Sequence, residues 1–396
     1  STSGPNELTW KLVGSMGVSQ LVCWGTLHYP IALFAGPISS ELDWCSAQVQ
    51  SGFSVATLMM AASSYSVGKW IDQHGGRLAM MAGCCLGALG CFLLSLTQTF
   101  TWYLAAWAVL GIGMRLALYD AAFAALAYVA GGAAKRAMSV VTIFGGLAST
   151  VFWPLGHHLL ELYGWRGALQ CYAGFLLACT LLHLTIPRAR TAAAASGSPT
   201  PQVEASPVPT KGSVLVLYTY GAVGVLFLQT GMAAHFLNLL TAAGWTQSTA
   251  VWLATLLGIG QFSGRAVVAL WAYRLNPVSL NLVPASLQVC CFAAYLVFGN
   301  LTAGALVFAF LYGAGNGMAT YTRGAMPLVL FDPARYGRIV GLVLKPALGL
   351  AAASPMVLGY GLEHWGAKTV AQAALALTFS MATCAALLYW TTRHRS

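Results

Sequence analysis

Four basic side chains lie inside long apolar runs, where a charge is costly and therefore indicates a specific role. They are Arg115, Arg265, Arg323 and Lys345. A charged side chain at the centre of a membrane helix costs about 2.5–3.5 kcal/mol on insertion scales. The same runs hold one central carboxylate, Asp120. Because guanidinium and ammonium groups bind carboxylates, this surplus of positive charge predicts a site for a small organic anion.

Two of these residues belong to a pair of related segments. Residues 111–124 read GIGMRLALYDAAFA, and residues 313–326 read GAGNGMATYTRGAM. Two glycines, an alanine and a tyrosine recur between them at an offset of 202 residues. We expect both segments to line the site, with the following substrate-binding residues: His28, Arg115, Tyr119, Arg265, Asn316, Tyr321, Arg323 and Lys345.

Asp120 and His235 are the predicted proton-coupling or gating groups. A carboxylate that loses a basic partner binds a proton more readily. Asp120 could therefore couple protons to transport, or it could form a permanent salt bridge to Arg323 or Lys345. His28 and His235 could contact substrate or protons, or they could be packing residues with satisfied hydrogen bonds.

The composition excludes a water-soluble globule. Hydrophobic residues make up 58% of the 396 residues and charged residues 7%, compared with about 25% charged in soluble domains. The ten cysteines show no CxxC spacing, so we expect them to pack as small apolar side chains. A His–Glu pair at His157 and Glu161, with His158 beside it, is too small a set to predict a metal site. No metal and no other cofactor is predicted.

Twelve apolar runs are each long enough to cross a bilayer, which takes about 20 residues. They cover residues 14–36, 47–67, 79–97, 101–129, 138–160, 166–186, 213–241, 246–273, 278–298, 302–330, 338–361 and 368–390. A stretch rich in Ala, Ser, Thr and Pro separates the two groups of six, as expected of a solvated linker. The predicted fold is therefore an all-α integral membrane protein with a bundle at 1–186, a linker at 187–212 and a bundle at 213–396.

The distribution of Lys and Arg predicts the orientation. With both termini in the cytoplasm, most basic residues outside the spans fall on the cytoplasmic side, as the positive-inside rule requires. The net charge of +10 then reflects topology, so no nucleic-acid partner is needed. The predicted location is the plasma membrane, with a bacterial inner membrane favoured and the lipid bilayer as the surrounding partner.

Sequence matches at offsets of 201–202 residues indicate an internal repeat. Besides the paired segments, residues 42–46 match residues 243–247, and Lys135-Arg136 matches Gly337-Arg338. Because each half has an even number of spans, the two halves cross in the same sense, as in parallel repeats. Substrate sites in such architectures lie near the midplane between the halves.

The loop after the second run carries a family motif. It reads Gly68-Lys-Trp-Ile-Asp72-Gln-His-Gly75-Gly-Arg77, which resembles the G-x-x-x-D-x-x-G-x-R loop of the major facilitator superfamily. The twelve runs, the linker and the repeat extend the resemblance to the whole chain. It implies alternating access, and it implies that Gly68, Asp72, Gly75 and Arg77 form a conformational loop that ties helix ends together.

Shorter matches point to the monocarboxylate and oxalate:formate branch of that family. Gly260-Gln261-Phe-Ser-Gly-Arg265 is similar to the branch's G-x-x-D-x-x-x-R pattern, although the glycine spacing differs by two and a Gln replaces the Asp. Lys345-Pro346 resembles the lysine of the oxalate exchanger. The helix 4 arginine of many proton-coupled members would fall at Trp107 and is absent.

The function that the sequence favours is secondary transport of a mono- or dicarboxylate, coupled to protons or exchanged for a counter-anion. The alternative is export of an amphipathic drug or metabolite by proton antiport, which the thirteen Trp residues favour and the basic cavity does not. Soft-metal uptake lacks paired MxxxM or CxxC motifs. No HExxH, Gly-x-Ser-x-Gly or Walker A pattern occurs, so we expect neither an enzyme nor an ATP-driven pump.

Overall fold

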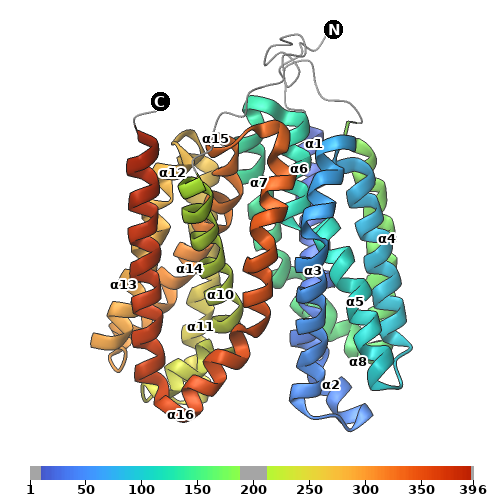
Figure 1. Cartoon of the computed structure of the whole chain (residues 1–396). Helices are drawn as coiled ribbons and strands as arrows, with labels where there is room; N and C mark the ends of the chain where they lie inside the picture. Colours follow the sequence, from blue (N-terminus) through green and yellow to red (C-terminus); the bar gives the residue numbers. More distant parts are fainter. Residues whose placement is uncertain (1–9, 188–211, 394–396) are drawn as a thin grey trace, which may run out of the picture. The chain divides into compact units, whose positions relative to one another are not determined.

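The computed structural model describes residues 10–187 and 212–393, and these residues contain helices and no strands. Figure 1 shows the helices with their labels. The predicted linker at 187–212 lies outside the described residues except for its two end positions. The chain divides into two compact units, one of Ser1–Pro201 with Asp332–Lys345 and the other of Gln202–Phe331 with Pro346–Ser396. The segment Asp332–Lys345 thus groups with the N-terminal part of the chain, whereas the sequence placed it in the second bundle.

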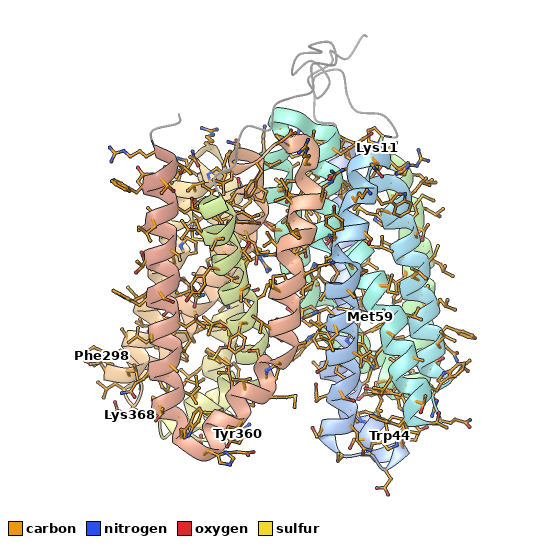
Figure 2. The ribbon with its side chains drawn as sticks, viewed as in Figure 1. Lys11, Trp44, Met59, Phe298, Tyr360 and Lys368 are labelled. Carbon is orange, nitrogen blue, oxygen red and sulfur yellow. The ribbon has the colours of Figure 1, made fainter. Side chains whose placement is uncertain are left out.

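The first unit is built from helices that mostly follow the predicted runs. They are α1 (Trp10–Cys23), η1 (Trp24–His28), α2 (Pro30–Leu42), α3 (Ser46–His74), α4 (Gly76–Ser95), α5 (Phe100–Ala117), α6 (Tyr119–Ala130), η2 (Gly131–Ala133), α7 (Ala134–Gly146), α8 (Ala148–Leu182), η3 (His183–Thr185) and, from the later segment, η5 (Pro333–Arg335) and the start of α16 (Tyr336–Thr392). Lys11 and Trp44 lie at opposite ends of this unit (Figure 2).

The second unit repeats the pattern with fewer interruptions. Its elements are α10 (Gly212–Ala242), α11 (Gln247–Leu270), η4 (Ala272–Arg274), α12 (Pro277–Leu280), α13 (Leu282–Phe298), α14 (Thr302–Ala325), α15 (Pro327–Leu330) and the rest of α16. Its core is a buried cluster of apolar and aromatic side chains, in which Phe236, Phe292 and Phe308 pack around Tyr312.

Seven helical stretches of the described chain are long and apolar enough to cross a membrane. Two of them, Phe100–Thr185 and Pro333–Thr392, span 86 and 60 residues, more than a single crossing requires. Gly164 and Gly366 interrupt α8 and α16 with φ of 67° and 78°, a region that glycine adopts without steric cost. The predicted runs 47–67 and 302–330 fall on α3 and α14, which are not among the seven.

Two helices of the first unit are broken where the sequence predicted continuous spans. The run 14–36 contains the π-helix η1 and a junction at Tyr29, and α2 then begins at Pro30, which has no N–H to donate. The run 101–129 is interrupted at Leu118, whose φ and ψ of −81° and −174° are extended. The prediction of one helix over each run is therefore wrong. At Leu118 the amide of Gln20 donates to the carbonyl of Ala117 over 2.7 Å, which satisfies a carbonyl that the break exposes.

The repeated glycines have the same packing role in both units. A Cβ at Gly111 would overlap the backbone carbonyl of Ala56 in α3, and a Cβ at Gly313 would overlap that of Leu257 in α11. Gly113 approaches Gly87 of α4 in the first unit, and Gly315 approaches Gln288 of α13 in the second. The glycines of the paired segments thus let α5 and α14 pack tightly on two neighbours each.

Candidate functional site

The two helix breaks of the first unit meet at an aromatic contact. The rings of Trp24 and Tyr119 have centroids 5.0 Å apart, and His28 packs edge-on against Trp24 at 4.8 Å. Tyr119 also donates its hydroxyl to the carbonyl of Thr142 in α7 over 3.0 Å. The buried indole N–H of Trp24 has no hydrogen-bond partner among the described residues. The predicted residues His28 and Tyr119 therefore lie together, with a polar atom beside them that the sequence did not single out.

Arg115 lies in the last turn of α5 and ties this helix to α3. Its Nε donates to the hydroxyl of Ser64 over 3.0 Å and its Nη2 to the carbonyl of Ser64 over 3.2 Å. The side chain is 1% exposed. A positive charge in the last turn of a helix is also stabilised by the helix dipole. The two bonds to Ser64 thus hold α5 against α3.

Asp120 lies in the first turn of α6, directly after the break. On a continuous helix its side chain would be turned about 140° from that of Arg115, but the extended Leu118 removes that constraint. The carboxylate now lies at the N-terminus of one half-helix, and the guanidinium lies at the C-terminus of the other. Each charge is therefore placed at the helix end that favours it.

Arg265 and Tyr321 form the most unusual pair of predicted site residues. Arg265 in α11 is 9% exposed, and its buried Nε has no hydrogen-bond partner among the residues that the structure describes. Tyr321 in α14 is 0% exposed, and its hydroxyl likewise finds no partner within the described part of the chain.

The packing of α11 against α14 places these two residues at the same level. A Cβ at Gly313 would overlap Leu257, and one at Gly317 would overlap Gln261, so each step of four residues on α14 matches four on α11. The next step brings Tyr321 level with Arg265. Buried polar groups are nearly always hydrogen-bonded in folded proteins. Two such groups at one level therefore mark a place where a ligand could supply the acceptor.

Arg323 lines a small cavity inside the second unit. The cavity has a volume of about 40 Å³, enough for a few water molecules. It lies among α10, α13, α14 and α16, and its polar lining comes from Asn281, Gln288 and Arg323. The carbonyl of Arg323 accepts a hydrogen bond from the hydroxyl of Tyr218 over 2.7 Å, which fixes α14 against α10.

Asn316 joins the same polar group. Its Oδ1 accepts a hydrogen bond from Nε2 of Gln288 over 3.0 Å, and Asn281 Oδ1 accepts one from the hydroxyl of Thr322 over 2.7 Å. The sequence predicted Asn316 as a site residue but not Gln288 or Asn281. A lone Gln within an apolar run was the signal for Gln288, since a buried amide needs partners.

His235 is held apart from these residues. Its Nε2 lies 2.7 Å from the carbonyl of Pro355 and its Nδ1 lies 3.1 Å from the amide of Asn238. Because a carbonyl only accepts, Nε2 carries the proton, and Nδ1 then accepts from the Asn238 amide. This arrangement ties α10 to α16.

The family loop binds the segment that begins α16. Both carboxylate oxygens of Asp72 accept backbone N–H groups, from Gly337 over 2.7 Å and from Arg338 over 2.8 Å. A Cβ at Gly68 would overlap the carbonyl of Gly337. Gly75 links α3 to α4 with φ of 79°. The loop therefore caps a helix N-terminus with a negative charge, the arrangement that the helix dipole favours.

Arg77 and Lys345 are the remaining predicted residues of this unit. Arg77 lies in the first turn of α4 and is partly exposed. Lys345 is exposed, and its Nζ lies 5.6 Å from the ring centroid of Tyr65 in α3, a cation–π contact. The structure thus groups Lys345 with α3 and the family loop.

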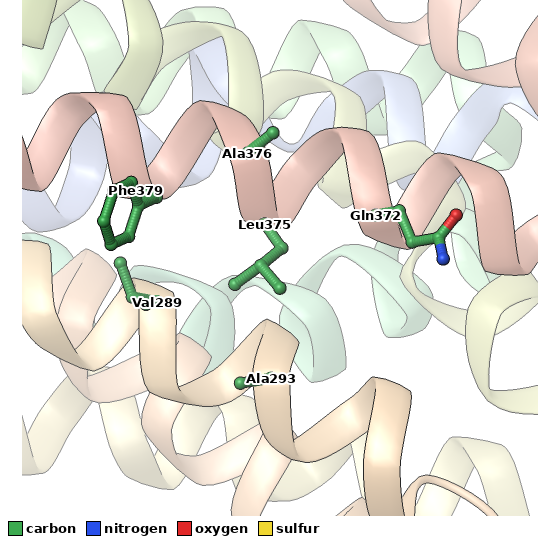
Figure 3. Close-up of a pocket in the computed structure, with 6 residues that line it drawn as sticks. All are labelled: Val289, Ala293, Gln372, Leu375, Ala376 and Phe379. Carbon is green, nitrogen blue, oxygen red and sulfur yellow. The ribbon is translucent and has the colours of Figure 1, made fainter.

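One groove among the described residues contains none of the predicted site residues. It has a volume of about 520 Å³ and lies between α13 and the later part of α16 (Figure 3). Its lining is apolar except for one amide: Val289, Ala293, Gln372, Leu375, Ala376 and Phe379. Such a surface offers no charge to an anion.

Three solved structures share this fold. The human organic anion transporter MFSD10 (TETRAN) is 17% identical with a TM-score of 0.69, and the match covers 96% of this chain and 100% of that one. The proton:xylose symporter XylE, bound to 6-bromo-6-deoxy-D-glucose, is 12% identical with a TM-score of 0.74, covering 96% and 95%. The transporter FucP in the outward conformation is 14% identical with a TM-score of 0.71, covering 96% and 99%.

A family model covers most of the sequence. The model of the Major Facilitator Superfamily matches residues 17–344. No curated protein was found to match the sequence. The matched range includes the family loop, the paired glycine segments and both helix breaks. The chain therefore belongs to the Major Facilitator Superfamily and is a multi-pass membrane transporter, not an enzyme.

Proposed function

We propose that the protein transports a small organic anion, a mono- or dicarboxylate, across the membrane. Members of its family carry out secondary transport by alternating access. What we add is the class of the transported substrate and the ion to which its transport is coupled. We further propose twelve membrane crossings in two groups of six with both termini in the cytoplasm. That arrangement agrees with the positions of Lys and Arg along the sequence.

The observation that carries the proposal is the pair Arg265 and Tyr321. A guanidinium is charged at any physiological pH, so leaving its buried Nε without an acceptor is costly. A carboxylate would accept two parallel N–H bonds from Arg265. The hydroxyl of Tyr321 at the same level could donate a third bond. A neutral or cationic substrate would leave the guanidinium unsatisfied, which favours an anion.

Neighbouring groups could complete the binding of the substrate. Arg323 and Asn316 lie on α14, the helix that carries Tyr321, and Arg323 adds a second buried positive charge. Arg115, Tyr119, His28 and Lys345 remain proposed contacts from the first unit. Asp120 and His235 stay the proposed proton-coupling or gating groups, and both ring nitrogens of His235 have partners.

The human neighbour is described as an organic anion transporter. At 17% identity its likeness concerns the fold, so the substrate class proposed here rests on Arg265 and Tyr321. The resemblance of Arg265 and Lys345 to the monocarboxylate and oxalate:formate branch leads to the same substrate class. Exchange for a counter-anion and proton coupling are the two energy sources to be compared.

The test is uptake of labelled carboxylates into proteoliposomes containing the purified protein. Uptake should be saturable and should respond to an imposed pH gradient or to a carboxylate loaded inside. Arg265→Gln should weaken substrate binding about 10- to 100-fold, because a hydrogen-bonded pair with a charged group is worth about 1.5–3 kcal/mol. Arg274→Gln is the matched control, since Arg274 follows the same helix and lies at the surface.

Two results would contradict the proposal. One is the absence of saturable uptake across a panel of mono- and dicarboxylates under both driving conditions. The other is equal loss of uptake in the Arg265→Gln and Arg274→Gln proteins. Resistance of a sensitised host to amphipathic drugs, together with drug-stimulated proton release, would instead support the alternative of drug export.

A further inference from the structure

Three cysteines and a histidine from separate helices meet inside the first unit. Cys23 ends α1, Cys84 lies in α4, Cys179 lies in α8, and His183 begins η3. The three sulfur atoms all lie within 4.8 Å of one another. Cys23, Cys84 and His183 are 0% exposed and Cys179 is 3% exposed. From this geometry we infer a buried binding site for one Zn²⁺ ion, independent of the proposed transport function.

The distances fit tetrahedral coordination. Zinc–sulfur bonds of about 2.3 Å at tetrahedral angles place two sulfurs about 3.8 Å apart. Cys23 Sγ and Cys84 Sγ lie 3.7 Å apart, and Cys84 Sγ lies 3.8 Å from Nδ1 of His183. Cys179 and His183 are four residues apart, so they share one face of the chain at the end of α8. Three thiolates and one imidazole form a common ligand set for structural zinc. The three sulfurs already form a close group, and His183, which borders it at Cys84, would complete the set after a small shift of its ring.

The second nitrogen of His183 is oriented by a neighbour. Its Nε2 lies 2.6 Å from the hydroxyl of Ser19 in α1, and Ser19 is 0% exposed. If Nδ1 binds the metal, Nε2 carries the proton and donates a hydrogen bond to the hydroxyl oxygen of Ser19. Metal-bound histidines nearly always donate their other N–H to such a partner, which fixes the ring and its tautomer.

Zinc suits the charge of the site better than other soft cations do. Binding releases the three thiol protons to solvent, and Zn²⁺ with three thiolates and a neutral imidazole carries a net charge of −1. A monovalent soft ion such as Cu⁺ would leave −2 in the same buried space, which costs more. The bound ion would tie α1, α4 and α8 together beside η1, because Cys23 directly precedes that π-helix.

The first experiment measures metal content. The full-length protein, purified in reducing buffer and equilibrated with Zn²⁺ against a weak chelator, should retain about one zinc per chain. Cys84→Ser, Cys179→Ser and His183→Ala should each lower the retained zinc at least tenfold. Ser19→Ala should weaken binding about 10- to 100-fold, the usual effect of losing such a partner. Cys91→Ser is the matched control, because Cys91 is a buried thiol of the same helix outside the cluster.

A second measurement separates loss of the site from loss of folding. Titration of the wild-type protein with Cd²⁺ should produce a thiolate-to-metal absorption band that saturates at one ion per chain. The band should persist in Cys91→Ser and weaken stepwise in the single cysteine variants that still elute as folded protein. No retained zinc and no cadmium band in folded wild-type protein would overturn the inference. So would a Cys23–Cys84 disulfide found in the protein isolated under non-reducing conditions.

Discussion

The buried arginines of this chain differ in the hydrogen-bond acceptors around them. We use that difference to distinguish an arginine that holds two helices together from one that could bind substrate. Arg115 has the hydroxyl and carbonyl of Ser64 as acceptors. Arg265 has no such acceptor among the residues described. The position equivalent to Arg265 in the first unit, 202 residues earlier, is Ser63. The sequence identified both arginines as buried charges, but it could not show that Arg115 bonds to Ser64.

Replacing Arg115 by Gln should destabilise the protein. The change removes the bonds from Nε and Nη2 to Ser64, for an expected loss of about 1.5–3 kcal/mol in the free energy of unfolding. Denaturant unfolding of the purified protein in detergent measures this loss. Ser64→Ala removes only the hydroxyl and should cost less, so the double variant should show a coupling energy.

The Arg115→Gln variant also distinguishes the two roles considered for Arg115, which are holding α5 against α3 and binding substrate. A protein of unchanged stability that no longer binds carboxylates would identify Arg115 as a binding residue and contradict the structural role. Lys11→Gln, at an exposed basic residue of the same unit, serves as the control for a change of one charge.

Helix breaks are the elements that the sequence predicted least well. Leu118 is neither Gly nor Pro, and the apolar run continues across it, so periodicity gave no warning. The break depends on tertiary contacts, such as the bond from Gln20 to Ala117. The break near His28 did have a local signal in Pro30. The cysteine cluster was missed for a related reason, because its ligands come from three helices and share no short motif.

Close helix packing gives a prediction at this scale. Gly313→Ala should destabilise the second unit by about 1–3 kcal/mol, because the new Cβ meets the rigid carbonyl of Leu257. Gly258→Ala in the neighbouring α11 has open space around its Cβ, and it should leave stability unchanged or raise it by up to about 1 kcal/mol. Thermal unfolding followed by tryptophan fluorescence compares the two. Equal effects would mean that the paired glycines do not set the helix spacing.

At the scale of the whole molecule, the sequence predicted the fold class well. Apolar runs, a repeat at 202 residues and one loop motif were enough to indicate the family. The sequence did not predict that Asp332–Lys345 groups with the first unit. Helix boundaries alone do not show which helices a segment packs against. Asp72 supplies the physical reason, since its carboxylate caps the start of α16.

Alternating access requires segments that can be released and rebound, and Asp72 offers one test. Asp72→Asn should weaken the cap, because an amide has one acceptor oxygen and presents N–H groups to a second donor. Loss of the negative charge at a helix N-terminus should cost about 0.3–1 kcal/mol in addition. Amide hydrogen exchange at Gly337 and Arg338 should therefore become several-fold faster.

The control for this prediction is Glu161→Gln, an exposed acid that pairs with His157. It should leave exchange at Gly337 and Arg338 unchanged. Unchanged exchange in Asp72→Asn as well would show that the cap does not hold this segment in solution.

The breaks in the first unit have no counterparts in the second. Leu118 corresponds to Thr320, which lies in the uninterrupted α14, and residues 24–28 correspond to residues 226–230 in the uninterrupted α10. The two halves of the repeat thus differ in helix continuity. The first unit has two interrupted helices, and the second has continuous helices at the matching positions. During a conformational cycle, the helices of the first unit should therefore bend at Leu118 and at η1. The helices α10 and α14 should stay straight.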